Sequence, residues 1–130
     1  MANFVDDYRD LLVNDPSILA YFGNNILYGA LPNEIDRDDP WLRWTIEDVE
    51  QTYYAGSQQP SRSTYSVIID ILLDDPNEVT RVVDWVSERL LDVQRYKNIR
   101  VSYITGKDYG NYEEKDLWVG ILSLRIVFVQ

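Results

Sequence analysis

Hydrophobic residues recur three or four positions apart near the N-terminus, and this spacing predicts a helix. Over residues 3–13 the apolar side chains fall on one stripe and the acidic ones on the opposite side. Asp15 and Pro16 then suit the cap and the first position of a short second helix, which Gly23 closes. The first part of the chain is therefore predicted to form two consecutive helices.

A third helix, at residues 75–93, is the clearest local signal. Asp75 suits the N-cap, Pro76 suits the first helical position, and Glu78 is placed to reach back to the cap. The apolar stripe predicted to pack on a sheet consists of Val79, Val82, Val83, Val86 and Leu90.

Apolar and polar residues alternate between these helices, which predicts two strands. The first covers residues 41–46, with the alternation extending toward Tyr54, and the second covers residues 65–73. The second is apolar on both faces, as is typical of a central strand. Because residues 55–61 have the composition of a loop, we expect an antiparallel hairpin with a long tip.

Two more strands are predicted after the third helix, over residues 98–105 and 117–129. Trp118 begins the apolar face of the last strand, so we expect it in the core together with Trp44. The residues between these strands, 106–115, combine glycines, tyrosines and charges, and we expect a mobile, exposed tip.

The predicted order of elements is α-α-β-β-α-β-β. This order indicates a single α+β domain over residues 1–130, with one mostly antiparallel sheet and the helices packed on one face. Residues 26–28 are expected to pair briefly in the sheet, and residues 29–40 to form a surface loop.

The composition excludes much chemistry, because the 130 residues include no cysteine and no histidine. Disulfides, thiol nucleophiles and zinc–thiolate sites are thereby excluded, and the commonest general base and transition-metal ligand is missing. The glycines form no phosphate-binding loop, and no Gly-x-Ser-x-Gly elbow is present. We therefore expect no catalytic residues, no metal and no cofactor.

Charge narrows the choice of partners further. The sequence holds 22 Asp and Glu against 12 Lys and Arg, a formal net charge of -10. Such a surface repels phosphate backbones and anionic lipid. The start of the chain has no signal-peptide pattern and no apolar run is long enough for a membrane span, so we expect synthesis in the cytoplasm and no membrane contact.

The acidic run at Glu34, Asp36, Asp38 and Asp39 offers oxygen ligands for a cation, but it lacks the spacing of a calcium-binding loop. A solvated loop is the simpler interpretation.

Several aromatic residues lie outside the predicted core. Trp85 lies at the border of the helical stripe, and Tyr53, Tyr54, Tyr109 and Tyr112 lie at or beside the predicted tips. Because Tyr and Trp dominate interface hot spots, we expect these residues to contact other proteins.

The pattern resembles a known family. The resemblance rests on five features of the sequence. They are the end of the first helix and the start of the second at Leu11-Leu12-Val13-Asn14-Asp15-Pro16, the segment Ile26-Leu27-Tyr28-Gly29, the strand at residues 42–46, the helix at 79–93 and the long apolar strand at 118–128. Together they are similar to the tail terminator or tail-completion proteins of long-tailed phages, small α+β proteins that stack as a ring between tail tube and head connector. The family has no catalytic residues to carry over.

The resemblance implies a structural virion protein of the tail or neck, made in the host cytoplasm. Its partners would be copies of itself in a ring, expected to be a hexamer, together with the tail tube protein and the head connector or stopper protein. DNA would pass through the ring without specific binding. The acids expected to line the passage are Glu34, Asp36, Asp38, Asp39, Asp108, Glu113, Glu114 and Asp116.

Three alternatives remain open at this stage. A head-side connector or stopper ring protein would share the composition. An acidic inhibitor that imitates DNA would carry its acids at phosphate-like spacing on one face. A small enzyme of unrecognised type would show one cleft with converging polar side chains.

Overall fold

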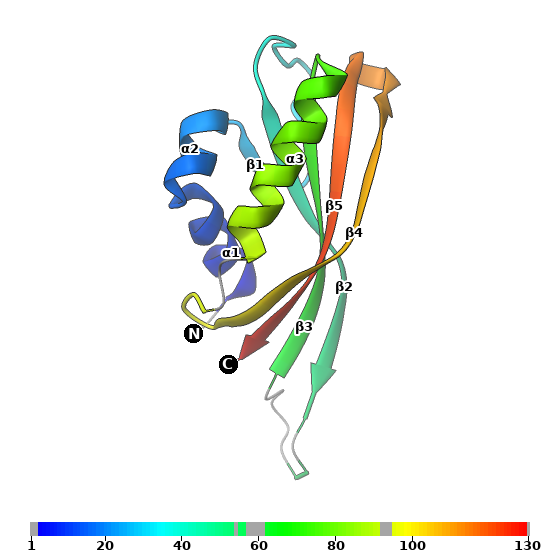
Figure 1. The fold of residues 1–130 in the computed structure, drawn as a ribbon. Helices are drawn as coiled ribbons and strands as arrows, with labels where there is room; N and C mark the ends of the chain where they lie inside the picture. Colours follow the sequence, from blue (N-terminus) through cyan, green and yellow to red (C-terminus); the bar gives the residue numbers. More distant parts are fainter. Residues whose placement is uncertain (1–2, 54, 57–61, 92–94, 130) are drawn as a thin grey trace.

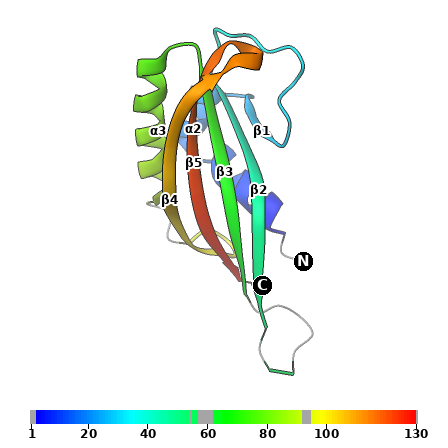
Figure 2. The same ribbon diagram turned by 90° about the vertical axis from the view of Figure 1, so that its right-hand side faces the viewer.

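The computed structural model describes residues 3–53, 55–56, 62–91 and 95–129 (Figure 1). Three helices lie on the same side of one sheet, and this arrangement confirms the predicted α+β class with helices on one face (Figures 1 and 2). The elements are α1 (Phe4–Val13), α2 (Pro16–Phe22), β1 (Ile26–Tyr28), β2 (Trp41–Thr52), β3 (Arg62–Leu73), α3 (Pro76–Leu91), β4 (Ile99–Tyr112), the 3-10 turn η1 (Glu113–Lys115) and β5 (Leu117–Val129).

The sheet is five-stranded, in the order β1-β2-β3-β5-β4. Neighbouring strands are antiparallel from β2 to β4, whereas β1 pairs parallel with β2, so the sheet is mixed. The parallel pair arises because the loop after β1 carries the chain back to the start of β2, and both strands then run the same way.

Local capping follows the sequence at α2 and only in part at α3. Asp15 caps α2 by accepting hydrogen bonds from the backbone N–H groups of Ser17 and Ile18, at 2.9 and 3.1 Å. Asp75 accepts from the N–H of Asn77 at 2.9 Å. Glu78, however, does not reach back to this cap.

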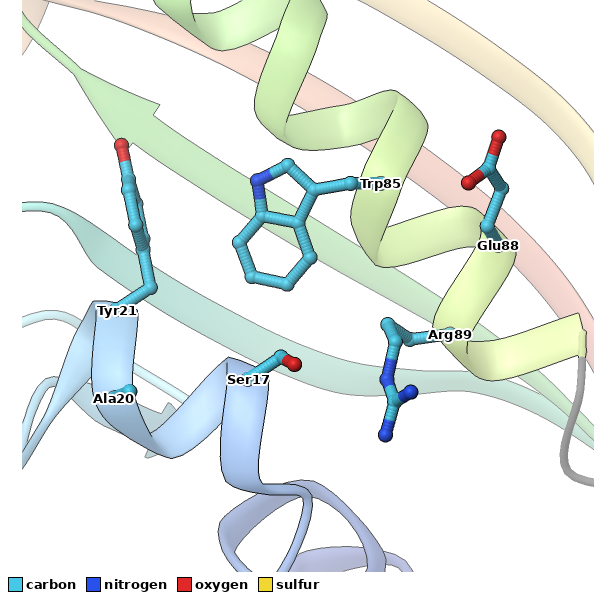
Figure 3. Close-up of a pocket in the computed structure, with 6 residues that line it drawn as sticks. All are labelled: Ser17, Ala20, Tyr21, Trp85, Glu88 and Arg89. Atoms are coloured by element: carbon cyan, nitrogen blue, oxygen red, sulfur yellow. The ribbon is translucent and has the colours of Figure 1, made fainter.

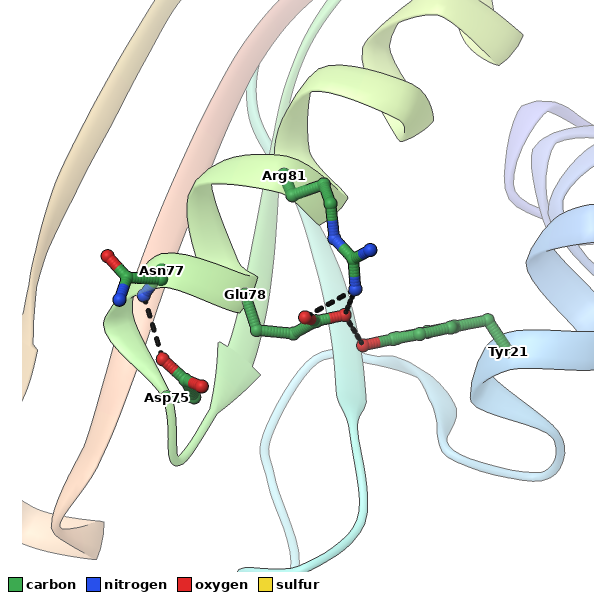
Figure 4. A network of polar contacts seen from close by, with 5 residues as sticks. All are labelled: Tyr21, Asp75, Asn77, Glu78 and Arg81. Atoms are coloured by element: carbon green, nitrogen blue, oxygen red, sulfur yellow. Dashed lines mark hydrogen bonds and ion pairs between the residues drawn. The ribbon is translucent and has the colours of Figure 1, made fainter.

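The Glu78 carboxylate instead makes a tertiary contact (Figure 4). It accepts a hydrogen bond from the Tyr21 hydroxyl of α2 at 3.3 Å and pairs with Arg81 one turn further along α3. Burial, and then the neighbouring Glu78 charge, raise the pKa of Tyr21 to about 12. The approach of α2 to the first turn of α3 therefore decides where this side chain points.

The main core lies between the helices and the sheet. The predicted stripe of α3 is buried as expected, and the α1 side chains Phe4 and Tyr8 join it through stacked and edge contacts with Tyr65 and Trp44. Trp44 is 1% exposed, which confirms its predicted place in the core.

The expected mobile tip at residues 106–115 is wrong. Strand β4 continues to Tyr112, and its residues pair with β5 from Gly106 opposite Ser123 to Tyr112 opposite Leu117. Only η1 and Asp116, with φ 54°, form the turn. A strand at the edge of the sheet has one paired side and largely solvent-facing side chains, so it can carry glycines and charges that read as a loop in the sequence.

Gly120 of β5 lies directly against α3. A Cβ there would meet Val83 Cγ2 at 2.2 Å and Val79 Cγ1 at 2.9 Å. We expect Gly120→Ala to lower the free energy of unfolding by about 1–3 kcal/mol, the usual cost of overpacking. Gly106→Ala is the matched control, because its Cβ would meet nothing closer than Ser123 Cβ at 4.0 Å. Urea denaturation checks both variants, and equal midpoints would contradict the close packing of α3 on β5.

Candidate functional site

The acidic loop at residues 29–40 is held to the molecule by an apolar underside. Leu31 and Ile35 pack against a second buried cluster on the face of the sheet opposite the helices. The Trp41 indole donates a hydrogen bond to the carbonyl oxygen of Asp36 at 3.0 Å. The loop therefore covers one end of this face and turns its carboxylates outward. The second cluster consists of Trp41, Leu72, Leu117 and Val119.

The same loop contacts the turn between β4 and β5. Arg37 pairs with Asp116 at 3.1 Å, and the Lys115 ammonium group donates to the carbonyl oxygen of Asn33. Figure 2 shows the loop and this turn side by side at one end of the sheet. Two acidic segments that are far apart in the sequence thus meet in one place.

We call this surface the acidic end. It contains every predicted passage acid except Asp108, and all of these side chains are exposed. Asp74 and Asp75 lie at the same end, because Leu73 pairs with Trp118 next to the β4–β5 turn. The residues of the acidic end are Glu34, Asp36, Asp38, Asp39, Asp74, Asp75, Glu113, Glu114 and Asp116.

Sequence reasoning missed Asp74 and Asp75, although the strand-to-helix turn that they occupy was visible in the sequence. Asp108 does not join the acidic end. It lies within β4, opposite Ile121, and accepts a hydrogen bond from the backbone N–H of Tyr109 at 2.9 Å.

The carboxylates of the acidic end are spread rather than convergent. Asp36 accepts a hydrogen bond from the backbone N–H of Asp38 at 3.0 Å, and Asp116 pairs with Arg37. In the part of the chain that the structure describes, no group of three or more acidic side chains is placed to hold a metal ion. The surface offers negative potential rather than a coordination site.

An aromatic hollow borders the acidic end. Trp118 is 38% exposed, which contradicts its predicted place in the core. It lies on the helix side of the sheet, beside the first turn of α3. The helix begins at this point, so it does not extend far enough to cover the indole. With exposed Tyr109 it lines a hollow of about 200 Å³, together with Pro76, Val79, Thr80, Gly110 and Val119.

Trp85 lies in a second hollow, of about 500 Å³, between α2 and α3 (Figure 3). Its indole points from α3 toward Tyr21 and Ser17 of α2, with the Tyr21 ring centroid 5.5 Å away in an edge contact. Arg89 closes the lower side by pairing with Asp15 at 2.9 Å. The Trp85 side chain therefore packs between α2 and α3, and the part of its surface that lines the hollow is accessible to solvent.

The predicted contact tyrosines fall in different places. Tyr53 is exposed at the end of β2 and donates to the Gln51 side chain at 2.9 Å, while Tyr54 lies outside the described residues. Tyr112 packs against the second cluster and donates to Glu114 at 3.3 Å. Tyr109 alone joins an aromatic hollow.

No protein-family model matches the chain, and neither does any curated protein. A chain in a solved structure of the virion of a native gene transfer agent particle superposes with a TM-score of 0.73. The two chains share one fold. The match covers 98% of this chain and 95% of the other, and the sequences are 14% identical. Among the described residues, no helix is long and apolar enough to cross a membrane.

Proposed function

We propose that the chain is a structural protein of a phage-like virion, and specifically a ring-forming tail terminator or tail-completion subunit. The observation that carries this proposal is the fold shared with a chain of a gene transfer agent virion over nearly the full length of both. The phage-tail resemblance of the sequence points the same way.

The proposed ring is a homo-oligomer, expected to be a hexamer, between the tail tube protein and the head connector or stopper protein. In this arrangement the acidic end faces the passage for DNA. Lys and Arg contacts to phosphates add affinity through counterion release and would slow the passage of DNA. A wall of carboxylates instead repels the backbone, with the repulsion screened beyond roughly 8 Å at physiological salt.

The aromatic hollow beside the acidic end supplies a contact for a neighbouring ring. Trp118 and Tyr109 are exposed, apolar and held by the regular β4–β5 pairing. Partly exposed Trp and Tyr side chains at the edge of a hollow are the usual anchors of protein interfaces.

Complementation tests the proposal. Particles made without this chain are expected to accumulate as separate heads and tails, and the purified chain added to the extract restores joined, infectious or transducing particles. The variant with Glu34, Asp36, Asp38 and Asp39 all changed to Lys is expected to join heads and tails yet to slow DNA release, because the passage then attracts phosphate. Asp6→Lys with Asp84→Lys and Glu88→Lys makes a comparable change in net charge on exposed helix residues away from the acidic end and serves as its DNA-release control.

The outcomes separate the candidates. Normal joining of heads and tails without the chain would contradict a role in the neck. Normal DNA release by the lysine variant would contradict the acidic passage but would leave the proposed role in joining untouched. Full heads that leak DNA, with intact and closed tails, would favour the head-side stopper ring.

The gathering of carboxylates at one end also favours a second candidate, an inhibitor that imitates DNA. Such a protein would bind a nucleic-acid enzyme through the acidic end and would be dispensable for joining heads to tails. Capture of a DNA-binding enzyme by the wild-type chain but not by the lysine variant, with normal particles in both cases, is the result that this candidate predicts.

A further inference from the structure

Both long edges of the sheet are open within the described residues. Strand β4 forms one edge along its whole length. At the other edge, β1 covers β2 only from Leu42 to Trp44, and residues 45–51 have no strand beside them on that side. Figure 2 shows β4 and β2 on opposite sides of the face that lacks helices. An open edge is a template for another strand.

The two open edges carry opposite charge. The free part of β2 exposes Glu47, Asp48 and Glu50 and contains no basic residue. Glu50 pairs with Arg125 across the sheet at 3.0 Å, whereas the Glu47 and Asp48 carboxylates make no hydrogen bond or ion pair within the described residues. The two are therefore available to a neighbour.

The beginning of β4 is basic. Arg95 and Lys97 precede the strand, and Arg100 lies within it. Lys97 pairs with Asp10, and Arg100 donates to the backbone carbonyl of Lys97, so both cations are held close to this edge. Arg95 is exposed and makes no ion pair within the described residues.

Strand direction fits an upright second copy. Antiparallel pairing of β2 with β3, β3 with β5, and β5 with β4 makes β4 run opposite to β2. A copy placed beside the first without inversion therefore brings its β2 antiparallel to β4, and the alternation of the sheet continues across the boundary.

Register places the acidic and basic segments at the same height. Asp48 pairs with Ser66, Ser66 with Arg125, and Arg125 with Tyr103. An upright neighbour thus sets its Asp48 beside Tyr103, close to Arg100 in the chain. Two β4 edges would bring basic residues together, and two β2 edges would bring acids together, so like charges disfavour both self-pairings.

We propose that residues 48–50 of one copy pair antiparallel with residues 101–103 of the next, joining subunits head to tail through their acidic and basic sheet edges. This inference rests on the proposed ring and names its subunit contact. A contact between two different surfaces generates a closed ring when the rotation between copies closes.

The irregularities of both strands fit this short contact. Register shifts occur at Ile46/Asp48 in β2, and at Ile99/Val101 and Ile104/Gly106 in β4. The regular runs between or after them are the proposed pairing segments. Because a bulge bends its strand, the bulge at Ile104/Gly106 lets the rest of β4 diverge from the β1 strand of the neighbour.

The contact would also cover apolar surface. Val101 and Tyr103 are 48% and 43% exposed on β4, and Val49 is exposed on the free part of β2. Burying exposed apolar side chains at the boundary favours association.

A charge swap tests the pairing. Glu47→Lys with Asp48→Lys makes both edges basic, and Arg95→Glu with Arg100→Glu makes both edges acidic. Each double variant alone is expected to sediment as a monomer and to fail in the joining assay. A mixture of the two restores both the multimer and joining, because every contact then pairs an acidic with a basic edge. Asp6→Lys with Asp84→Lys makes the same change in net charge on exposed helix residues, away from the proposed pairing segments and from the acidic end, and this control is expected to assemble.

Thermal melts establish that all variants are folded. Double variants that assemble as the wild type does, or folded variants whose mixture stays inactive in the joining assay, would overturn the edge pairing while leaving the ring intact. A wild-type chain that fails to join heads and tails contradicts the proposed function itself.

Discussion

Replacing Val83 with aspartate is expected to lower the free energy of unfolding by about 4 kcal/mol, among the largest effects of any single substitution in this protein. Val83 is fully buried in α3 and packs directly against Gly120 of β5. A carboxylate there would lose its hydration with no cation or hydrogen-bond donor to replace it. Urea unfolding followed by tryptophan fluorescence measures the change.

Thr80→Asp provides the matched control for this experiment. It introduces the same carboxylate one turn earlier, on the exposed side of α3 and near the helix N-terminus, where an acid is tolerated. We expect a change within about 0.5 kcal/mol. If Val83→Asp matched Thr80→Asp in stability, the orientation of α3 on the sheet would be refuted.

Truncating Trp44 and Trp118 to alanine is expected to change the free energy of unfolding by very different amounts, because the first ring lies in the core and the second at the surface. Trp44→Ala should lower the free energy of unfolding by about 3–5 kcal/mol, because it removes a fully buried ring. The ring makes an edge contact with Tyr8, with ring centroids 5.1 Å apart, and a tilted contact with Tyr28 at a centroid distance of 4.4 Å. Trp118→Ala should cost about 1 kcal/mol or less, since that ring is partly exposed in the aromatic hollow and other side chains do not enclose it.

The second readout of this pair is assembly. Folded Trp118→Ala is expected to lose activity in the joining assay, as a truncated interface anchor does. Equal destabilisation by the two truncations would show that Trp118 belongs to the core. Stable, fully active Trp118→Ala would remove the aromatic hollow from the proposed contacts.

Helix α3 could be predicted from the sequence because its signals are local. The cap at Asp75, the proline after it and the valine stripe lie within a few turns of one another in the chain. Glu78 is the exception in this helix: the nearby Tyr21 of α2 draws its carboxylate away from the cap.

The extent of β4 could not be predicted in the same way. Its upper half pairs with β5 on one side only and exposes charged and glycine residues, so no alternation of apolar and polar residues marks it as a strand. Trp118 was misplaced for a related reason. Its face of the sheet was predicted correctly, but where α3 begins to cover that face depends on how the helix crosses the sheet.

The sequence identified acids of the acidic end but could not show that they lie together. The acids at residues 34–39 and 113–116 were both identified as candidates, but their meeting depends on the Arg37–Asp116 pair and on loop packing over Trp41. Contacts between segments so far apart in the chain leave no periodicity in the sequence. Asp108 was grouped with them because the strand that carries it was read as part of the same tip.

Electron cryomicroscopy of the neck of the particle that encodes this chain tests the central claim most directly. The account predicts a closed ring of this chain between the tail tube and the head connector, with Glu34, Asp36 and Glu113 facing the DNA passage. Absence of the chain from the neck would contradict it. A passage lined mainly by basic residues would contradict the acidic wall, the candidates being Arg81, Arg89, Arg95, Lys97 and Arg100.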